Sequence, residues 1–547
     1  MRCIDMQHEC KITVLETKCF SKFICIFLIL TLVLTVTGCR ESASPEQESE
    51  AQTDTGIDML SRTGRTQYTA ALSISRPESM EDFVYVQGNQ SISFQNDSED
   101  PWNEIVFREF SPSVLTQEAW AVSTEGRSRP YDPGEAQHTA IESVSQEGEP
   151  LEFREENDPS IVKVLLKEPL EPGAACTIDM TFTVKVTAGS SRQGFEQVDF
   201  INKDDHNDAS EITVSLGPIL PVLAKYVDGE WICHEYFEDG ECFFTDCADY
   251  HVEVTLPEGF TVVASGKETL NADGTFSIVA ENMRDFTLIA GDLLGHKETK
   301  WGNITVRSWY YDNGNEVYAK AAERALDIAV DALETFTEYY GEYAYDELDI
   351  VFTPFHHAGM ESPGLIRIDD LACLTSSEAD DSGEGDESYR SFRTNIVHEI
   401  AHEWFYASVG NDCFTEPWLD EGFARFSELI FAEKNGLNET AKELITTSRE
   451  KYEGSGKGPI NIASDEASIF QESDPEDYAY GWTVYEGSAL YLYDLREAMG
   501  EDRFDDFMHD WYSNHMNSIV TTEQFLRELY QADDSKKVHE TVDRYMK

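Results

Sequence analysis

Positive charge is scarce in this chain of 547 residues. It holds 41 Lys and Arg against 105 Asp and Glu, which gives a formal net charge of −64 at pH 7. A surface of this sign repels phosphate groups, so nucleic acid and anionic lipid headgroups are excluded as direct partners. The same charge favours solubility and attracts cationic substrates. The acidic run at residues 376–388 is expected to be a solvated loop, with a calcium site as the less favoured alternative.

Two other features are missing. No Cys-x-x-Cys pair occurs among the 11 cysteines, which argues against a cysteine-based zinc site. No internal repeat is evident either. The apolar run at residues 23–36 is fourteen residues long, which is too short for a comfortable membrane span.

That apolar run instead has the length of a signal-peptide core, and two lysines precede it. It ends in Val-Thr-Gly-Cys39, which resembles the bacterial lipobox. We expect a lipoprotein signal peptide at residues 1–38, a lipidated Cys39 and a flexible acidic tether at residues 39–66. The mature protein would then be extracytoplasmic and lipid-anchored to the bacterial cell membrane. An uncleaved signal anchor is the alternative.

The remaining chain divides by its hydrophobic pattern into two domains. Residues 67–297 contain alternating apolar runs separated by turn sequences, which predict an all-β domain with strands at 161–166, 176–186 and 250–256. Residues 298–547 contain helical periodicity instead, with helices expected at 316–340, 485–499, 503–516 and 522–530. The sequence thus predicts a multidomain α+β protein.

The most informative motif of the second domain is His398-Glu399-x-x-His402, which Glu421 follows after eighteen residues. Two histidines four positions apart lie on one face of a helix and can bind one metal ion. Glu421 stands at the start of a second helical stretch, from which it can supply a third ligand. Three protein ligands leave one tetrahedral position open, as in catalytic rather than structural zinc sites, and Glu399 is a candidate general base. Two solvated histidines on a surface helix are the alternative, but apolar neighbours indicate a buried helix.

The block at residues 398–424 resembles, without a gap, the core of the aminopeptidase N-like gluzincins. The resemblance implies one Zn²⁺ per chain held by His398, His402 and Glu421, with Glu399 activating water. It also implies an N-terminal β domain followed by a thermolysin-like catalytic domain. Residues 249–266 resemble the end of the family's β domain. Because the chain ends at residue 547, we expect this member to lack the family's C-terminal helical domain.

A second motif lies about forty residues upstream, at residues 358–362. There Ala-Gly359-Met360-Glu361-Ser362 resembles the family's Gly-Ala-Met-Glu-Asn exopeptidase motif, with Gly and Ala exchanged and Ser362 in place of Asn. The resemblance implies that Glu361 binds the free α-amine of a peptide, a pairing that suits a carboxylate and an ammonium. Residues 348–352 read as a strand just before it, so the motif should lie at or beside a sheet edge, where Gly359 and Met360 can contact the substrate backbone.

A third motif follows Glu421 by sixty-four residues, where Tyr485 begins a block that resembles the family's oxyanion-stabilising tyrosine block. A phenol that donates to developing negative charge is chemically suited to that task. Gly487-Ser488 stands where the family has Lys-Gly, and Tyr478 and Tyr480 remain as rival candidates.

The preferred reading is therefore a zinc aminopeptidase that hydrolyses N-terminal residues from peptides at the cell exterior. A zinc endopeptidase or an epoxide hydrolase on the same scaffold is the second class of function. A non-catalytic surface binding protein is the third. The intact metal-binding set disfavours the third, and Glu361 favours the first over the second.

Overall fold

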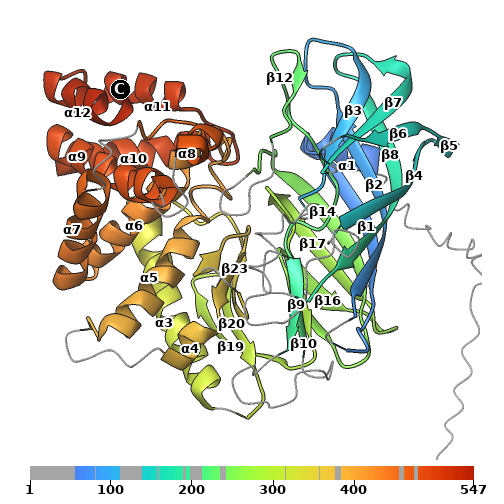
Figure 1. Cartoon of the computed structure of the whole chain (residues 1–547), viewed down its shortest axis with the longest axis horizontal. Coiled ribbons are helices and arrows are strands. Elements are labelled where there is room, and N and C mark those ends of the chain that lie inside the picture. Colours follow the sequence, from blue (N-terminus) through green and yellow to red (C-terminus); the bar gives the residue numbers. More distant parts are fainter. Residues whose placement is uncertain are drawn as a thin grey trace, which may run out of the picture. The chain divides into compact units, whose positions relative to one another are not determined.

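The computed structural model describes residues 56–547 except for 80–81, 111–137, 157, 159, 189–192, 198–211, 235–241, 315, 356–357, 376–382, 455–460 and 473–478. The predicted signal peptide, Cys39, most of the predicted tether and Tyr478 lie outside the described residues. Residues 54–547 form one compact unit (Figure 1).

Strands are the main regular elements of the described N-terminal part. The largest sheet runs β16 (Lys267–Leu270), β17 (Phe276–Met283), β14 (Ala248–Thr255), β1 (Gln67–Ile74), β2 (Val84–Gln95), β8 (Ala175–Val186), β4 (His138–Gln146) and β5 (Glu149–Pro150). Two four-stranded sheets run β15 (Thr261–Ala264), β18 (Leu288–Gly291), β10 (Ile212–Leu216), β9 (Gln193–Gln197), and β11 (Val222–Leu223), β3 (Trp102–Arg108), β7 (Ile161–Leu170), β6 (Glu152–Glu155). A small hairpin pairs β12 (Tyr226–Val227) with β13 (Glu230–Trp231).

The alternating patterns explain these strands. In β8 every second side chain from Cys176 to Val186 is buried, so one face of the strand meets the core and the other does not. The predicted strands at 161–166, 176–186 and 250–256 are confirmed as β7, β8 and β14. The Tyr68 and Tyr250 rings stack with centroids 4.8 Å apart where β1 and β14 pair in parallel.

A five-stranded sheet opens the second part of the chain. Its order is β19 (Leu294–Trp301), β20 (Ile304–Tyr311), β21 (Glu347–Thr353), β23 (Leu365–Asp369) and β22 (Gly359–Met360). The strands β20, β21 and β23 are parallel, and α3 (Glu316–Tyr339) crosses from β20 to β21. Among the described strands the short β22 pairs with β23 alone, so Gly359 and Met360 lie at a sheet edge, as predicted.

Helices follow the sheet (Figure 1). They are α4 (Leu371–Thr375), α5 (Glu387–Ala401), η2 (Pro417–Leu419), α6 (Glu421–Lys434), α7 (Asn438–Gly454), α8 (Glu466–Glu472), the π-helix η3 (Gly481–Gly487), α9 (Ser488–Met499), α10 (Glu501–His515), α11 (Thr522–Ala532) and α12 (Lys536–Met546). The four predicted helices are present with shifted ends, while α7 and α12 were not predicted. The α+β prediction is confirmed. None of the described helices has both the length and the apolar character of a membrane span.

Two predictions about polar segments are wrong in part. The sequence predicts a flexible tether up to residue 66, but residues 56–63 form the helix α1 (Gly56–Thr63), whose Leu60 is buried. Arg65 then pairs with Asp249 at 2.7 Å, so the chain is fixed before β1 begins. In the acidic run, Glu384 is buried rather than solvated, because its carboxylate accepts hydrogen bonds from the backbone amides of Glu439 and Thr440 at the start of α7.

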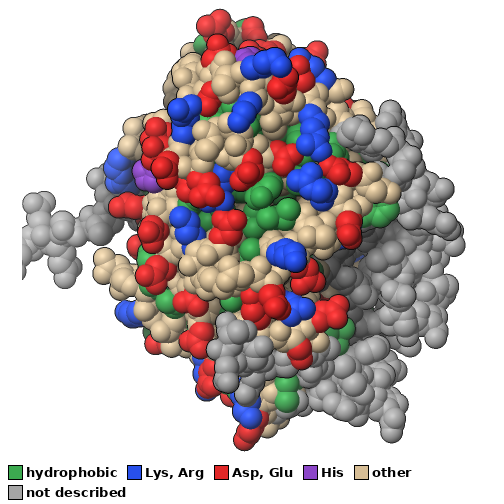
Figure 2. Space-filling view, turned by 90° about the vertical axis from the view of Figure 1, so that its left-hand side faces the viewer, with side chains coloured by type: hydrophobic (Ala, Val, Ile, Leu, Met, Phe, Trp, Pro, Cys, Tyr) green, Lys and Arg blue, Asp and Glu red, His purple; other side chains and the backbone are tan. Residues whose placement is uncertain are grey.

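Many acidic side chains lie on the surface, as the composition predicts. In Figure 2, Asp and Glu side chains are spread over the visible face and are interspersed with Lys and Arg. Several of these charges pair locally, such as Arg544 with Asp494 at 3.0 Å and Arg449 with Glu453 at 3.0 Å. Exposed pairs of this kind each stabilise the fold by about 0–1 kcal/mol.

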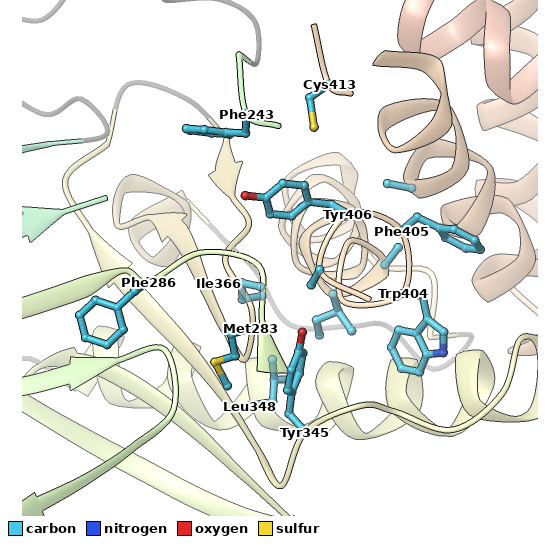
Figure 3. Close-up of a cluster of buried hydrophobic side chains, with 14 of the residues drawn as sticks. Phe243, Met283, Phe286, Tyr345, Leu348, Ile366, Trp404, Phe405, Tyr406 and Cys413 are labelled. Atoms are coloured by element: carbon cyan, nitrogen blue, oxygen red, sulfur yellow. The ribbon is translucent and has the colours of Figure 1, made fainter. Parts of the chain in front are cut away.

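Buried side chains of the β-rich part meet those of the helical part beside the end of α5. Figure 3 shows Phe243 of the β-rich part close to Tyr406, and Met283 of the same part close to Ile366. Arg284 is also buried here, and among the described residues its guanidinium donates to backbone carbonyls, including Tyr406 O at 2.6 Å and Thr245 O at 2.6 Å. A buried cation with several acceptors fixes the loop that follows α5 against the β-rich part.

Candidate functional site

Helix α5 carries His398, the first candidate metal ligand. The sequence forms a helix here because its start is capped and one of its faces is apolar. The Asp386 side chain accepts from the backbone N–H of Tyr389 at 3.0 Å, which satisfies an otherwise unpaired donor of the first turn. Phe392, Ile396 and Ile400 are buried. The regular helix ends at Ala401, and His402 follows as its C-cap, still in helical conformation.

Helix α6 supplies the third candidate ligand. Glu421 is its first residue, and the preceding Asp420 caps it by accepting from the Glu421 backbone N–H at 2.7 Å. The prediction that Glu421 begins a second helix is therefore confirmed. Gly422 lets another segment come close, since a Cβ there would meet the Ser488 Cβ at 2.3 Å.

The three predicted metal ligands converge. The Nε2 atoms of His398 and His402 are 3.3 Å apart, and Glu421 Oε2 is 3.2 Å from the first and 3.3 Å from the second. Tetrahedral ligands about 2.0–2.1 Å from a zinc ion stand roughly 3.3–3.4 Å from one another. Two imidazoles and a carboxylate at this spacing fit a zinc ion that keeps one position open.

The outer nitrogens of the two histidines are also held. His398 Nδ1 lies 2.8 Å from Glu428 Oε1, and His402 Nδ1 lies 3.0 Å from Phe405 O. Each Nδ1–H therefore has an acceptor, which turns the lone pair of each Nε2 toward the common point.

The carboxylates around His398 and His402 favour a positive charge at the point where the three ligand atoms meet. Burial alone would lower the pKa of His398, but hydrogen bonds to Glu421 and Glu428 raise it to about 10. Burial would raise the pKa of Glu421, but the two imidazoles hold it well below its usual range. A divalent cation at this point would supply the charge that protons otherwise provide.

Glu399 faces the same point from α5. It is buried, and burial raises its pKa to about 8, with the Glu361 carboxylate adding to the rise. Its carboxylate packs directly on Gly359, because a Cβ at that glycine would lie 2.3 Å from Glu399 Oε1. The glycine of the upstream motif thus leaves the space that the candidate base occupies.

We expect Gly359→Ala to lower kcat roughly 100-fold, because the added methyl group displaces the Glu399 carboxylate by an ångström or more. Zinc content should stay unchanged, since neither residue belongs to the three-ligand set. Gly454→Ala is a matched control, because no atom lies within 4 Å of the Cβ it would add. A wild-type kcat in Gly359→Ala would show that Glu399 does not depend on this contact.

Glu361 lies beside this base. Carboxylate oxygens of Glu361 and Glu399 and a ring nitrogen of His402 lie within 4.8 Å of one another, so the upstream motif and the metal-binding motif share one site. Glu361 is buried, and the next residue, Ser362, is hydrogen-bonded through its hydroxyl to Thr287 of the β-rich part at 2.8 Å. The serine that replaces the family's Asn therefore ties the motif to the β-rich part.

Tyr485 reaches the site from η3. Its hydroxyl donates to Glu421 Oε1 at 2.5 Å, and its ring stacks on His398 with centroids 5.9 Å apart. A Cβ at Gly487 would lie 2.6 Å from the Tyr452 ring, so the position occupied by Lys in the family has no room for a side chain here. The rival Tyr480 packs against Tyr485, with the two ring centroids 6.1 Å apart.

Several residues at the site were not predicted. Asp285 accepts a hydrogen bond from the Tyr406 hydroxyl, and burial raises the pKa of Asp285 to about 7. Tyr406 has a φ of 120°, which non-glycine residues rarely adopt. These contacts join positions more than a hundred residues apart, and no local spacing indicates them. Glu428 could have been found, since it lies seven positions after Glu421 on the same face of one helix.

Known proteins resemble this chain in both sequence and fold. The Peptidase family M1 domain model matches residues 324–545. Aminopeptidase B of Mus musculus is 25% identical over 315 residues, which cover 55% of this chain and 45% of that protein. Aminopeptidase RNPEPL1 of Homo sapiens is 25% identical over 323 residues, covering 55% and 40%. The chain thus spans about half the length of these curated relatives.

A solved structure covers more of the chain. The M1 zinc metallopeptidase from Deinococcus radiodurans superposes with a TM-score of 0.58 and 17% sequence identity, covering 88% of this chain and 94% of that one. The likeness in fold therefore extends over the β-rich part as well as the helical part.

Proposed function

We propose that this chain, which belongs to the aminopeptidase N-like family of zinc metallopeptidases, removes single residues from the N-terminal ends of peptides. The observation that carries the proposal is the place of Glu361. Its carboxylate lies beside Glu399 and His402, while His398, His402 and Glu421 already complete a metal-binding set. An anionic group next to the reacting centre, and not needed for the metal, suits a substrate with a free ammonium.

Each residue of the site has a task in such a hydrolysis. Zinc is the metal of this family, and when bound it supplies Lewis acidity that polarises a carbonyl and makes water more acidic. Glu399 takes a proton from the attacking water and returns it to the nitrogen that leaves as the peptide bond breaks. The Tyr485 hydroxyl donates to the negative charge that develops on the carbonyl oxygen. Glu361 holds the ammonium and so fixes which peptide bond is cut.

The experiment that tests the function compares one peptide with its N-acetylated twin. Incubation of the unblocked peptide should release residues one at a time from its N-terminal end, as seen by mass spectrometry. The acetylated peptide should stay largely intact, and a chelator should stop both reactions. Internal cleavage of both peptides at similar rates would point to the endopeptidase alternative.

The Glu361→Gln variant isolates the role of the carboxylate. Losing a buried, charge-assisted contact typically costs about 2–5 kcal/mol, or roughly thirty- to several-thousand-fold in kcat/KM for the unblocked peptide. The slow cleavage of the acetylated peptide should hardly change, because no ammonium is lost there. Equal losses for the two peptides would show that Glu361 serves the structure rather than the amine.

We also propose that the protein is lipid-anchored outside the cytoplasm. This rests on the sequence of residues 1–39, in which a short apolar run ends at Cys39. In the Cys39→Ser variant, the protein should no longer be found in the membrane fraction of the cell. Labelling by a radioactive fatty acid should also be lost. Membrane association that persists in this variant would favour an uncleaved signal anchor.

A further inference from the structure

Arg425 of α6 lies between two buried carboxylates, those of Glu428 and Glu486. Glu428 contacts the metal-ligand candidate His398, and Glu486 is the neighbour of Tyr485 in the chain. Arg425 Nη1 donates to Glu428 Oε2, while its Nε and Nη2 lie 3.2 and 3.3 Å from Glu486 Oε2 and Oε1. The side chains of Glu428 and Glu486 are 3% and 6% exposed, so neither carboxylate can rely on water for its hydrogen bonds. The guanidinium is thus the charge partner that both share.

One carboxylate leads to the metal-binding set. The other oxygen of Glu428, Oε1, accepts from His398 Nδ1 at 2.8 Å. A carboxylate in this place fixes the tautomer and the ring orientation of a metal-binding imidazole. Arg425 in turn fixes the carboxylate, so it acts on His398 through one intermediate residue.

The other carboxylate leads to the candidate oxyanion donor. Glu486 follows Tyr485 in the π-helix η3 and also accepts from Ser448 Oγ at 2.6 Å and Lys451 Nζ at 2.8 Å, both on α7. Four donors from α6 and α7 therefore hold this single turn. π-helical turns are rare and are often found at functional sites. The Tyr485 hydroxyl meets Glu421 at 2.5 Å only while the turn keeps its place.

We propose that Arg425 is a positioning residue that sets His398 and Tyr485 relative to each other, through Glu428 on one side and Glu486 on the other. The part that concerns Tyr485 rests on the proposed hydrolysis. The part that concerns His398 is independent of the proposed hydrolysis, because it is tested by measuring zinc affinity alone.

The Tyr485 side is tested by a double-mutant cycle with Glu486→Gln and Tyr485→Phe. An amide has one acceptor oxygen, so the glutamine of the first variant keeps the shape of the side chain but cannot satisfy four donors. We expect Glu486→Gln to lower kcat about tenfold with KM and zinc affinity nearly unchanged. In the Tyr485→Phe background it should change kcat less than twofold, because it acts through the lost hydroxyl. An equal factor in both backgrounds would overturn this part.

The His398 side is tested by Arg425→Met, with Arg425→Lys as the second variant if Met prevents folding. Either change removes the planar fork that grips two carboxylates. Zinc affinity is measured by competition with a chromophoric chelator, and the dissociation constant should rise about tenfold or more. A wild-type dissociation constant in a folded Arg425 variant would overturn the proposal, whether or not the protein cleaves peptides.

Glu433→Gln is the matched control. Glu433 is also on α6 and pairs with an arginine, Arg496, at 2.6 Å, but that arginine contacts neither His398 nor Tyr485 among the described residues. The control should keep the zinc affinity and kcat of the wild type. If it lost as much as Glu486→Gln, the effects would reflect general weakening of the helices. Absence of cleavage of any unblocked peptide by the wild type would count against the proposed function only, since the zinc measurement still decides the role of Arg425.

Discussion

Glu399→Gln is expected to lower kcat roughly 100- to 10,000-fold while the protein stays folded and keeps its zinc. General acid–base groups typically contribute rate factors of that size. Glutamine has the shape of glutamate but cannot take a proton from water. Because Glu399 does not belong to the set formed by His398, His402 and Glu421, its replacement leaves the metal ligands in place. Steady-state kinetics on an unblocked peptide and elemental analysis of the same sample check both halves of the expectation.

Glu403→Gln is the matched control for this variant. Glu403 is also buried, four positions along the chain, and accepts from the Gly364 backbone N–H at 2.9 Å and from the Tyr343 hydroxyl at 3.4 Å. A glutamine oxygen can accept both bonds, so kcat should stay close to that of the wild type. If Glu399→Gln also kept most of its activity, another group would have to be the base.

His402→Ala is expected to lose zinc and activity together. It removes one of three ligand atoms that stand 3.2–3.3 Å apart. Even substitutions of residues that only support a ligand cost about 10- to 100-fold in metal affinity, and loss of a ligand should cost more. The dissociation constant for zinc, measured on the metal-free variant, gives the direct readout.

The control for that change is His515→Ala. His515 is half-buried and, like His402, lies next to a carboxylate, in its case Glu528 at 3.0 Å. It lies on α10 and does not belong to either group of candidate metal ligands among the described residues. The control should retain full zinc. Full zinc in His402→Ala as well would remove His402 from the metal-binding set.

The sequence predicts the metal-binding set well because the signal is local. His398 and His402 are four positions apart on one helical segment, and Glu421 begins the next long helix, so their meeting depends on only two short elements. The edge position of Gly359 and Met360 was also predictable, since a strand directly precedes the motif. Tyr485 was identified through a resemblance to known proteins rather than through any spacing rule.

Contacts between distant segments were not predictable in the same way. Arg425 reads as an ordinary polar residue of a helix, and its role depends on Glu486, which lies sixty-one positions away. Arg284 and Asp285 meet Tyr406 from another part of the fold, and no periodicity links them. Glu384 looked solvated because it lies among acids, yet it caps α7, a helix that was not predicted.

The position of the bound metal decides whether Glu399 and Glu361 can have the roles proposed for them. The described residues contain two groups of donors that share His402, one with His398 and Glu421 and the other with Glu361 and Glu399. Crystals of the purified zinc-loaded protein, with data collected on both sides of the zinc absorption edge, would locate the ion by its anomalous signal. We expect one strong peak per chain between His398, His402 and Glu421, with Glu399 and Glu361 outside the metal-binding set, where they can act as the base and as the group that binds the amine. A peak between Glu361, Glu399 and His402 would contradict it, because the two carboxylates would then be occupied by the metal.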